Sequence, residues 1–344
     1  MPGFPAHRVE PLAAVVLSVL SAGCLNNPAD HPYQGEYAAE MQLVWEAFDS
    51  LYVGFAQRDL DWDEMGEYYL SRAAGAEDHW EAWSLMAEML GILEDPGVIM
   101  YNPSWDTTLV HWEPESFTNV DYDVLMEALE PDGFRWVQEG IWGYAVHGPD
   151  SIPVLVVAQW SGLFSVPQYD LFLDTYGDAP AMIIDARLCG AGDIVSARNL
   201  ARNHLEQTRV VYYQQRRAPG EGHAMAPPEP VDLYYRYGYE GPTAVLIGQG
   251  NRGAGDYFAA MMTTIPHVTL MGDTTLGACS GYGYRQLPEG WLYSVPDITL
   301  LRLDTTFVEG SGIAPNIYVE ATQEDFAAGV DPVLEHALEW AESQ

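Results

Sequence analysis

The sequence predicts a mixed α/β protein in which a helical N-terminal subdomain precedes an α/β core with a partly parallel sheet. Over residues 36–93, apolar residues recur every three or four positions, which is the period of an amphipathic helix. From Pro153 onward, short apolar segments alternate with helical ones, an order that favours parallel strands joined by helices. Hydrophobic residues make up 48% of the chain, so it can bury a large core, which excludes a disordered protein.

The helical subdomain is expected to span residues 36–97. Two apolar stripes define it: Met41, Val44, Trp45, Phe48, Leu51 and Tyr52 in the first, and Trp80, Trp83, Met86, Met89, Leu90 and Leu93 in the second. Between them, Asp61-Trp62-Asp63 is typical of a helix start and predicts a third helix running toward Ala74. Stripes with this spacing indicate a packed core rather than a ligand cage.

The rest of the chain divides into a mixed, turn-rich connecting segment, residues 98–150, and a core domain, residues 151–344. Strands are expected at residues 153–159, 181–185, 210–214, 243–248 and 268–271. Helices are expected at residues 194–206, 255–264 and 331–342. Residues 282–303 are expected to form a hairpin and a further strand.

The charge balance excludes several functions. The chain has 50 acidic and 14 basic residues and a formal net charge of −36, and all of the basic residues are Arg. An acidic surface repels phosphate backbones, so we expect no nucleic-acid partner. Without lysine there is no Schiff base, Ser–Lys dyad or P-loop. No zinc-binding spacing such as HExxH or CxxC occurs, so neither a metal nor a cofactor is expected.

The N-terminus resembles a bacterial lipoprotein signal. Residues 11–23 form an apolar run too short to span a bilayer, and small residues precede Cys24. The resemblance implies a signal over residues 1–24, lipidation of Cys24, a polar tether over residues 25–35, and export to the bacterial cell envelope. The membrane would then be contacted only through the lipid. The alternative is an ordinary secretory signal with a chance cysteine.

Seven segments in chain order carry a resemblance to a known enzyme family. They are residues 92–98, 183–187 with the turn 190–192, 245–247 with 251–258, 272–277, 287–290, 309–316 and 329–338. In this order they resemble the signatures of tail-specific (C-terminal-processing) serine peptidases. The resemblance implies a crotonase-like β-β-α spiral core. Residues 102–153 are short for a PDZ domain, so the chain is most similar to the tricorn-like branch and to retinoid-binding relatives that lack one.

The resemblance also places the family's reactive groups. The nucleophile position is Gly253, in a turn where the family has serine, and the base position is Gly97, where the tricorn-like branch has histidine. The acidic partner maps onto Glu309. Glycine can neither attack a carbonyl nor accept a proton, so the resemblance implies a degenerate centre. Backbone amides could still form an oxyanion nest, which needs no side chain; they belong to Gly190, Ala191, Gly192 and Ala254.

Displaced residues are the alternative to a degenerate centre. Ser280 and Ser311 are the alternative candidates for the nucleophile, and Cys279 is a thiol alternative. The remaining histidines that could act as a base are not in a motif and are expected to be surface or core residues: His111, His147 and His267.

Cys189 and Cys279 lie in two loops that flank the site in the family. Export and this proximity suggest a disulfide, and two unpaired buried thiols are the alternative.

The sequence therefore predicts an exported, lipid-anchored pseudo-peptidase that holds a peptide tail, a protein tail or a small apolar ligand in its former substrate cleft. The contrasting hypothesis is an active serine peptidase that uses displaced residues. A third possibility is a structural envelope protein with an empty cleft.

Overall fold

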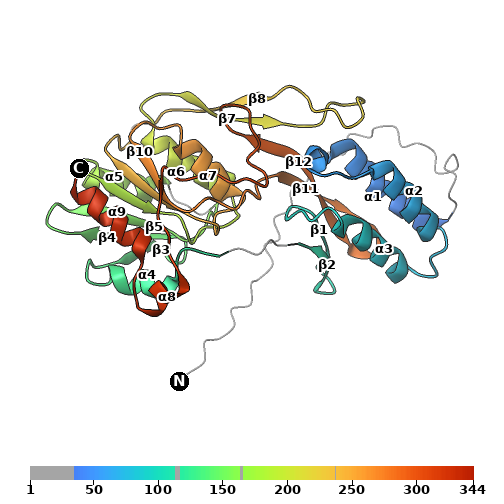
Figure 1. The fold of residues 1–344 in the computed structure, drawn as a ribbon, viewed down its shortest axis with the longest axis horizontal. Coiled ribbons are helices and arrows are strands. Elements are labelled where there is room, and N and C mark those ends of the chain that lie inside the picture. The colour runs from blue at the N-terminus through green and yellow to red at the C-terminus, as the bar shows by residue number, and fades with distance from the viewer. Residues whose placement is uncertain (1–34, 113–116, 163–165, 237) are drawn as a thin grey trace, which may run out of the picture.

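The computed structural model describes residues 35–112, 117–162, 166–236 and 238–344. The signal, the tether and Cys24 lie outside the described residues. The chain is elongated, with a helical lobe at one end, an α/β lobe at the other, and strands of a second sheet running between them (Figure 1). No helix in the described part of the chain is long and apolar enough to cross a membrane.

The helical lobe consists of α1 (Glu36–Leu51), the short 3₁₀ helix η2 (Val53–Gln57), α2 (Trp62–Ala73) and α3 (His79–Gly91). The helix predicted from Asp61-Trp62-Asp63 is α2, where the Asp61 carboxylate accepts a hydrogen bond from the Glu64 backbone amide. Asp78 caps α3 in the same way. The buried faces of these helices pack together with Trp291, Tyr293 and Val295, so the lobe is built onto the second sheet.

The α/β lobe contains a seven-stranded sheet in the order β13-β10-β9-β6-β5-β4-β3. Its strands are β3 (Arg135–Gln138), β4 (Trp142–His147), β5 (Ile152–Val157), β6 (Met182–Asp185), β9 (Thr243–Ile247), β10 (Val268–Gly272) and β13 (Ile317–Tyr318). Strands β5, β6, β9, β10 and β13 pair in parallel, whereas β3, β4 and β5 pair antiparallel. The expected partly parallel sheet is thus confirmed.

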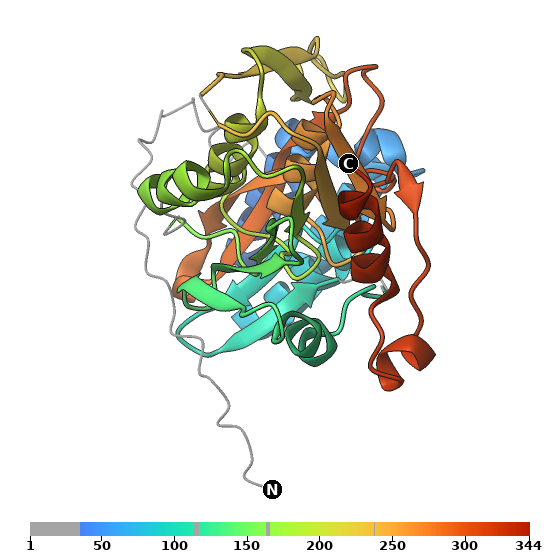
Figure 2. The same ribbon diagram turned by 90° about the vertical axis from the view of Figure 1, so that its left-hand side faces the viewer.

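Helices cover both faces of this sheet. One face carries α5 (Val166–Tyr176), α6 (Ile194–Ala201, continued by the 3₁₀ turn Arg202–His204) and α7 (Ala254–Met262). The other carries α4 (Tyr122–Leu129), α8 (Gln323–Ala327) and α9 (Pro332–Glu342). Figure 2 shows α5 and α9 on opposite sides of the strands. Along the chain, α7 begins at Ala254, shortly after the buried strand β9 ends at Ile247.

The second sheet has the order β2-β1-β12-β7-β8, with β11 also paired to β12. Its strands are β1 (Ile99–Asn102), β2 (Thr107–His111), β7 (Arg209–Gln215), β8 (Glu229–Leu233), β11 (Gly281–Gln286) and β12 (Leu292–Leu301); η4 (Pro288–Gly290) joins β11 to β12. The hairpin expected over residues 282–303 is therefore β11–β12, whereas the further strand expected there is absent from these residues. Strand β12 pairs with β1 near its start and with β7 near its end, so it links the two lobes.

The segment 98–150 is more regular than its turn-rich sequence suggested. It supplies β1 and β2 to one sheet, β3 and β4 to the other, and α4. These elements are four to eight residues long. Elements so short show little periodicity, and the strands owe their stability to pairing with partners distant in sequence.

Candidate active-site cleft

Gly253 occupies the turn between β9 and α7. Its backbone has φ 53° and ψ −116°, a left-handed conformation that favours glycine. Its amide donates to the Ala278 carbonyl at 2.8 Å, which ties the turn to the loop after β10. A Cβ built here would lie 3.3 Å from Cα and Cβ of Ala191. A small side chain therefore fits only if Ala191 yields by a few tenths of an ångström.

Gly97 lies in a tight loop that Asp95 organises. The Gly97 amide donates to Asp95 Oδ1 at 2.8 Å, and the Tyr52 hydroxyl donates to Asp95 Oδ2 at 2.6 Å. Arg58 forms an ion pair with the same carboxylate at 3.3 Å. Burial, followed by the nearby Asp95 charge, raises the pKa of Tyr52, so this phenol remains a hydrogen-bond donor.

Glu309 is half-buried and fixes the loop that follows Gly277. Its Oε2 accepts hydrogen bonds from the Cys279 amide at 3.0 Å, the Ser280 amide at 2.8 Å and the Ser280 hydroxyl at 2.9 Å. Burial raises the pKa of Glu309, and repulsion from Asp95 adds to this effect.

These positions converge on one cavity of about 150 Å³, which we call the central pocket. Gly97, Gly253 and Glu309 all line it, although they lie far apart in the sequence. Its other lining residues are Pro96, Ile99, His111, Ala191, Arg252, Ala278, Ser280 and Tyr282.

Comparison with known proteins accounts for this arrangement. The sequence profile of peptidase family S41 matches residues 167–319, from α5 to β13. Residues 167–319 are therefore similar to peptidase family S41. It is 28% identical over 160 residues to a tricorn protease from Thermoplasma volcanium, a match that covers 46% of this chain and 14% of that protein. The resemblance inferred from the seven segments is thereby confirmed.

Solved structures show the same fold. A peptidase-like protein from Parabacteroides merdae ATCC 43184 matches with a TM-score of 0.78 and 22% identity, covering 90% of this chain and 97% of that one. A photosystem II D1 C-terminal processing protease matches with a TM-score of 0.59 and 14% identity, covering 83% and 94%. At these identities the likeness concerns the fold alone.

The other predicted site residues are distributed around the pocket. Ser280 and Ala191 line it, and Gly190 lines an adjoining cavity that shares Ala191 and Arg252 with it. Gly192 lies against Trp160, since a Cβ there would be 2.3 Å from the Trp160 carbonyl oxygen. Ala254 is buried in the first turn of α7.

Ser311 does not line the central pocket. Its hydroxyl donates to the Phe307 carbonyl at 2.8 Å and accepts from Arg302 at 2.9 Å. Among the histidines, His111 at the end of β2 lines the central pocket. His147 instead contacts Asp132, and His267 contacts Glu206.

Sequence analysis missed two residues that hold the Gly253 turn. The Asn251 side-chain amide donates to the carbonyls of Ala186 at 2.7 Å and Cys189 at 2.9 Å, and its oxygen accepts from Gly248. Asn251 thereby joins the Gly253 turn to the glycine-rich turn. Its position two residues before Gly253 was the available signal.

The second missed residue is Asp256 on α7, which is fully buried. It accepts from the Thr275 hydroxyl at 2.5 Å and from the Gly277 amide at 3.0 Å, so it connects α7 to the loop after β10. Burial raises the pKa of Asp256 to about 7. The family motif has an acidic residue here, which was the available signal.

Cys189 and Cys279 are both buried free thiols, and no disulfide joins these two described cysteines. The suggested disulfide is therefore wrong, and the alternative of two unpaired thiols describes this structure. Burial raises the pKa of each thiol, and for Cys279 the neighbouring Glu309 adds to the effect. Both thiols are thus weak nucleophiles.

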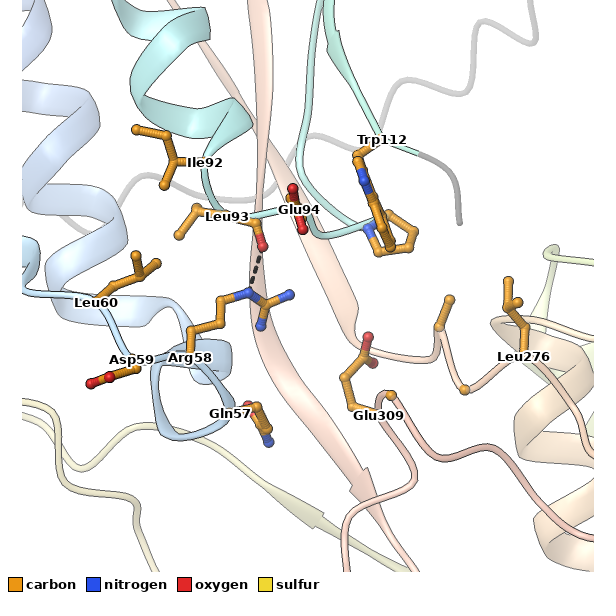
Figure 3. A pocket seen from close by; sticks show the side chains of 14 residues that line it. Gln57, Arg58, Asp59, Leu60, Ile92, Leu93, Glu94, Trp112, Leu276 and Glu309 are labelled. Atoms are coloured by element: carbon orange, nitrogen blue, oxygen red, sulfur yellow. Dashed lines mark hydrogen bonds between the residues drawn. The ribbon is translucent and has the colours of Figure 1, made fainter. Parts of the chain in front are cut away.

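A second cavity of about 500 Å³ adjoins the central pocket, and we call it the acidic pocket (Figure 3). The two cavities share Pro96, Ala278 and Glu309. Arg58 and Glu94 from the helical lobe, and Trp112 beyond β2, line its other side. The cleft therefore runs between the two lobes.

Proposed function

We propose that this protein binds an extended peptide or protein tail in the cleft between its lobes without cleaving it. One observation carries the proposal: Gly97, Gly253 and Glu309 line one pocket, and two of these three positions have no side chain. Acyl transfer requires a nucleophile and a base within hydrogen-bond reach of each other. At the family positions this chain offers neither.

The remainder of the site favours retained binding. Asp95, Asn251, Asp256 and Glu309 each make several hydrogen bonds that position the loops of the cleft. These buried or half-buried polar contacts fix the conformations of the loops beside the cavities. Charged and polar groups line those cavities, which favours a peptide over a small apolar ligand.

The test uses purified protein, fluorescent peptides of eight to ten residues and internally quenched versions of the same peptides. We expect saturable binding by fluorescence polarisation and no turnover of the quenched peptides. Cleavage of any bound peptide, abolished by a single substitution in the central pocket, would overturn the proposal.

A second candidate function is hydrolysis through Ser280, since Ser280, His111 and Glu309 line the same pocket. The Ser280 hydroxyl donates directly to Glu309 Oε2 at 2.9 Å, and the raised pKa of Glu309 makes it a stronger base. A fluorophosphonate probe distinguishes the two candidates. Under the peptide-binding proposal it labels neither the parent protein nor Ser280→Ala. Labelling that Ser280→Ala abolishes and the matched control Ser311→Ala retains would establish Ser280 as a nucleophile.

We also propose that the protein is exported and lipid-anchored at Cys24. The apolar run before Cys24 and the polar stretch after it support this location. A lipoprotein from Streptococcus agalactiae has a similar fold, with a TM-score of 0.59 at 12% identity. Metabolic labelling with a palmitate analogue in a bacterial host tests the anchor. We expect label in the membrane fraction, and none after Cys24→Ala.

A further inference from the structure

The acidic pocket has an aromatic wall and two carboxylates that face the same space. Figure 3 shows the Trp112 ring beside Glu94 on one side of the cavity, with the Glu309 carboxylate pointing into it from the opposite loop. Glu94 is exposed and Trp112 and Glu309 are half-buried, so a ligand can reach all three. Pro96, Ala278 and Glu309 connect this space to the central pocket.

Arg58 is the one cation among the residues that line the acidic pocket, and it already has hydrogen-bond partners and an ion-pair partner. Its Nε donates to the Leu93 carbonyl at 2.5 Å, and its Nη1 donates to the Gly54 carbonyl at 3.1 Å. Its Nη2 lies 3.3 Å from the carboxylate of Asp95, which is only 2% exposed. The buried Asp95 carboxylate therefore balances the charge of the Arg58 guanidinium. Among the residues that line the acidic pocket, no further cation balances Glu94 and Glu309.

The resulting field favours a positive ligand. Burial and the neighbouring Asp95 both raise the pKa of Glu309, so a cation placed beside this carboxylate would favour its charged form. An indole ring attracts a guanidinium or ammonium group through its π-face. The formal net charge of −36 adds long-range attraction for basic peptides.

We infer that the acidic pocket binds an Arg or Lys side chain of the peptide held in the cleft, so that basic peptides are the preferred ligands. This inference rests on the proposed peptide-binding function. The aliphatic stem of the ligand residue would pack on Pro96 and Leu276, and its charged end would lie between Glu94 and Glu309 beside Trp112. Glu94 and Trp112 are then specificity-determining residues.

The test compares octapeptides of Ala and Ser that carry a single Arg at position 2, 4 or 6 with the same peptides carrying citrulline. Citrulline has nearly the same shape as arginine but no charge. We expect at least one arginine peptide to bind about tenfold tighter than its citrulline partner at low salt. Glu94→Gln and Trp112→Ala should each reduce this ratio several-fold. The matched control Glu139→Gln removes an exposed charge outside the pocket and should leave the ratio unchanged.

The possible outcomes separate the two claims. If citrulline and arginine peptides bind equally well, the inference is wrong while the peptide-binding function stands. Tighter binding of citrulline would also overturn the inference, because it would show that the pocket disfavours a positive charge. If none of these peptides binds, the proposed function fails together with the inference. A ratio that falls equally in Glu94→Gln and Glu139→Gln would reduce the effect to net charge and overturn the assigned pocket.

Discussion

The proposed reactive positions of the cleft and the residues around them differ in whether they carry side chains. Gly253 and Gly97 have no side chain, whereas Asp95, Asn251 and Asp256 around them are buried and make multiple hydrogen bonds. A buried carboxylate or amide is costly unless it is satisfied, so these supports stabilise the loops whether or not catalysis occurs. The difference indicates that the geometry of the cleft can persist independently of its chemistry.

The largest expected effect comes from removing a support. Asp95→Ala leaves the Tyr52 hydroxyl and the largely buried Arg58 without their shared carboxylate. We expect the free energy of unfolding to fall by about 4 kcal/mol, the range for breaking one partner of a buried ion pair. Urea denaturation measures the loss. Asp59→Ala, an exposed neighbour in sequence, should change stability by less than about 0.5 kcal/mol. A loss as small for Asp95 would show that the loop does not depend on this network.

Asp256 should make stability depend on pH. Its pKa in the folded state is about 7, above the value of 3.8 for a free carboxyl, so the folded protein holds this proton more tightly than the unfolded chain. The contribution is present below pH 4 and is lost as pH rises through 7, by roughly 4 kcal/mol. Asp256→Asn cannot ionise, so the stability of the variant relative to the parent should increase between pH 4 and pH 8.

Denaturation of both proteins across that range measures the difference and cancels the other acidic groups. Asp325→Asn is the matched control, because hydrogen bonds from Thr322 lower the pKa of this exposed carboxyl. Its difference from the parent should not increase as pH rises through 7. A flat Asp256→Asn difference would mean that this carboxyl is ionised throughout the range in the folded protein.

Restoring the reactive side chains should cost less stability than removing a support. A Cβ at Gly97 would lie 3.0 Å from Pro296 Cγ, so Gly97→His should lower the free energy of unfolding by about 2 kcal/mol. Gly253→Ser must place a side chain at φ 53° with Ala191 at 3.3 Å and should cost about 1 kcal/mol. We expect the double variant to cleave quenched peptides and to react with fluorophosphonate.

Each single variant should stay inactive. Gly253→Ser alone has a hydroxyl without a base to accept its proton, and Gly97→His alone has a base without a nucleophile. Adding Pro296→Ala should recover part of the stability lost through Gly97→His, which would assign that loss to the crowded contact. An inactive but folded double variant would show that the cleft has diverged beyond its two glycines.

The sequence anticipated those parts of the site that lie in contiguous motifs. The sequence grouped Gly253, Glu309 and the glycine-rich turn because each sits inside a short segment whose order resembles the family's, and Gly253, Glu309 and Ala191 do line one pocket. The hairpin β11–β12 was also predictable from its aromatic alternation. The family signatures are short contiguous motifs, and such motifs can be recognised in a single sequence.

Contacts between distant segments could not be predicted. Tyr52 and Asp95 are 43 residues apart and meet through a loop of the helical lobe. Trp112 reaches the acidic pocket only because β2 pairs with β1, which itself pairs with β12. Contacts of this kind leave no spacing or periodicity in the sequence. Neither the acidic pocket nor the contacts of Arg58 could therefore be predicted from it.

The smallest expected effect is the change in melting temperature when the two core cysteines are exposed to a reducing agent. This measurement tests whether a covalent bond holds the loops of the cleft. Hydrogen bonds from Asn251 to the Cys189 carbonyl and from the Cys279 amide to Glu309 fix both loops, and both thiols are free. Adding a reducing agent should therefore shift the melting temperature by less than about 1 °C, since no covalent link is lost.

Peptide mapping after alkylation identifies the thiols individually. Under native conditions neither Cys189 nor Cys279 should react, because burial raises the pKa of both and excludes the reagent. In urea without reductant, both should become fully alkylated. A disulfide would instead protect both until reductant is added. Such a result would show that hydrogen bonds, and no covalent link between these two cysteines, hold the two loops.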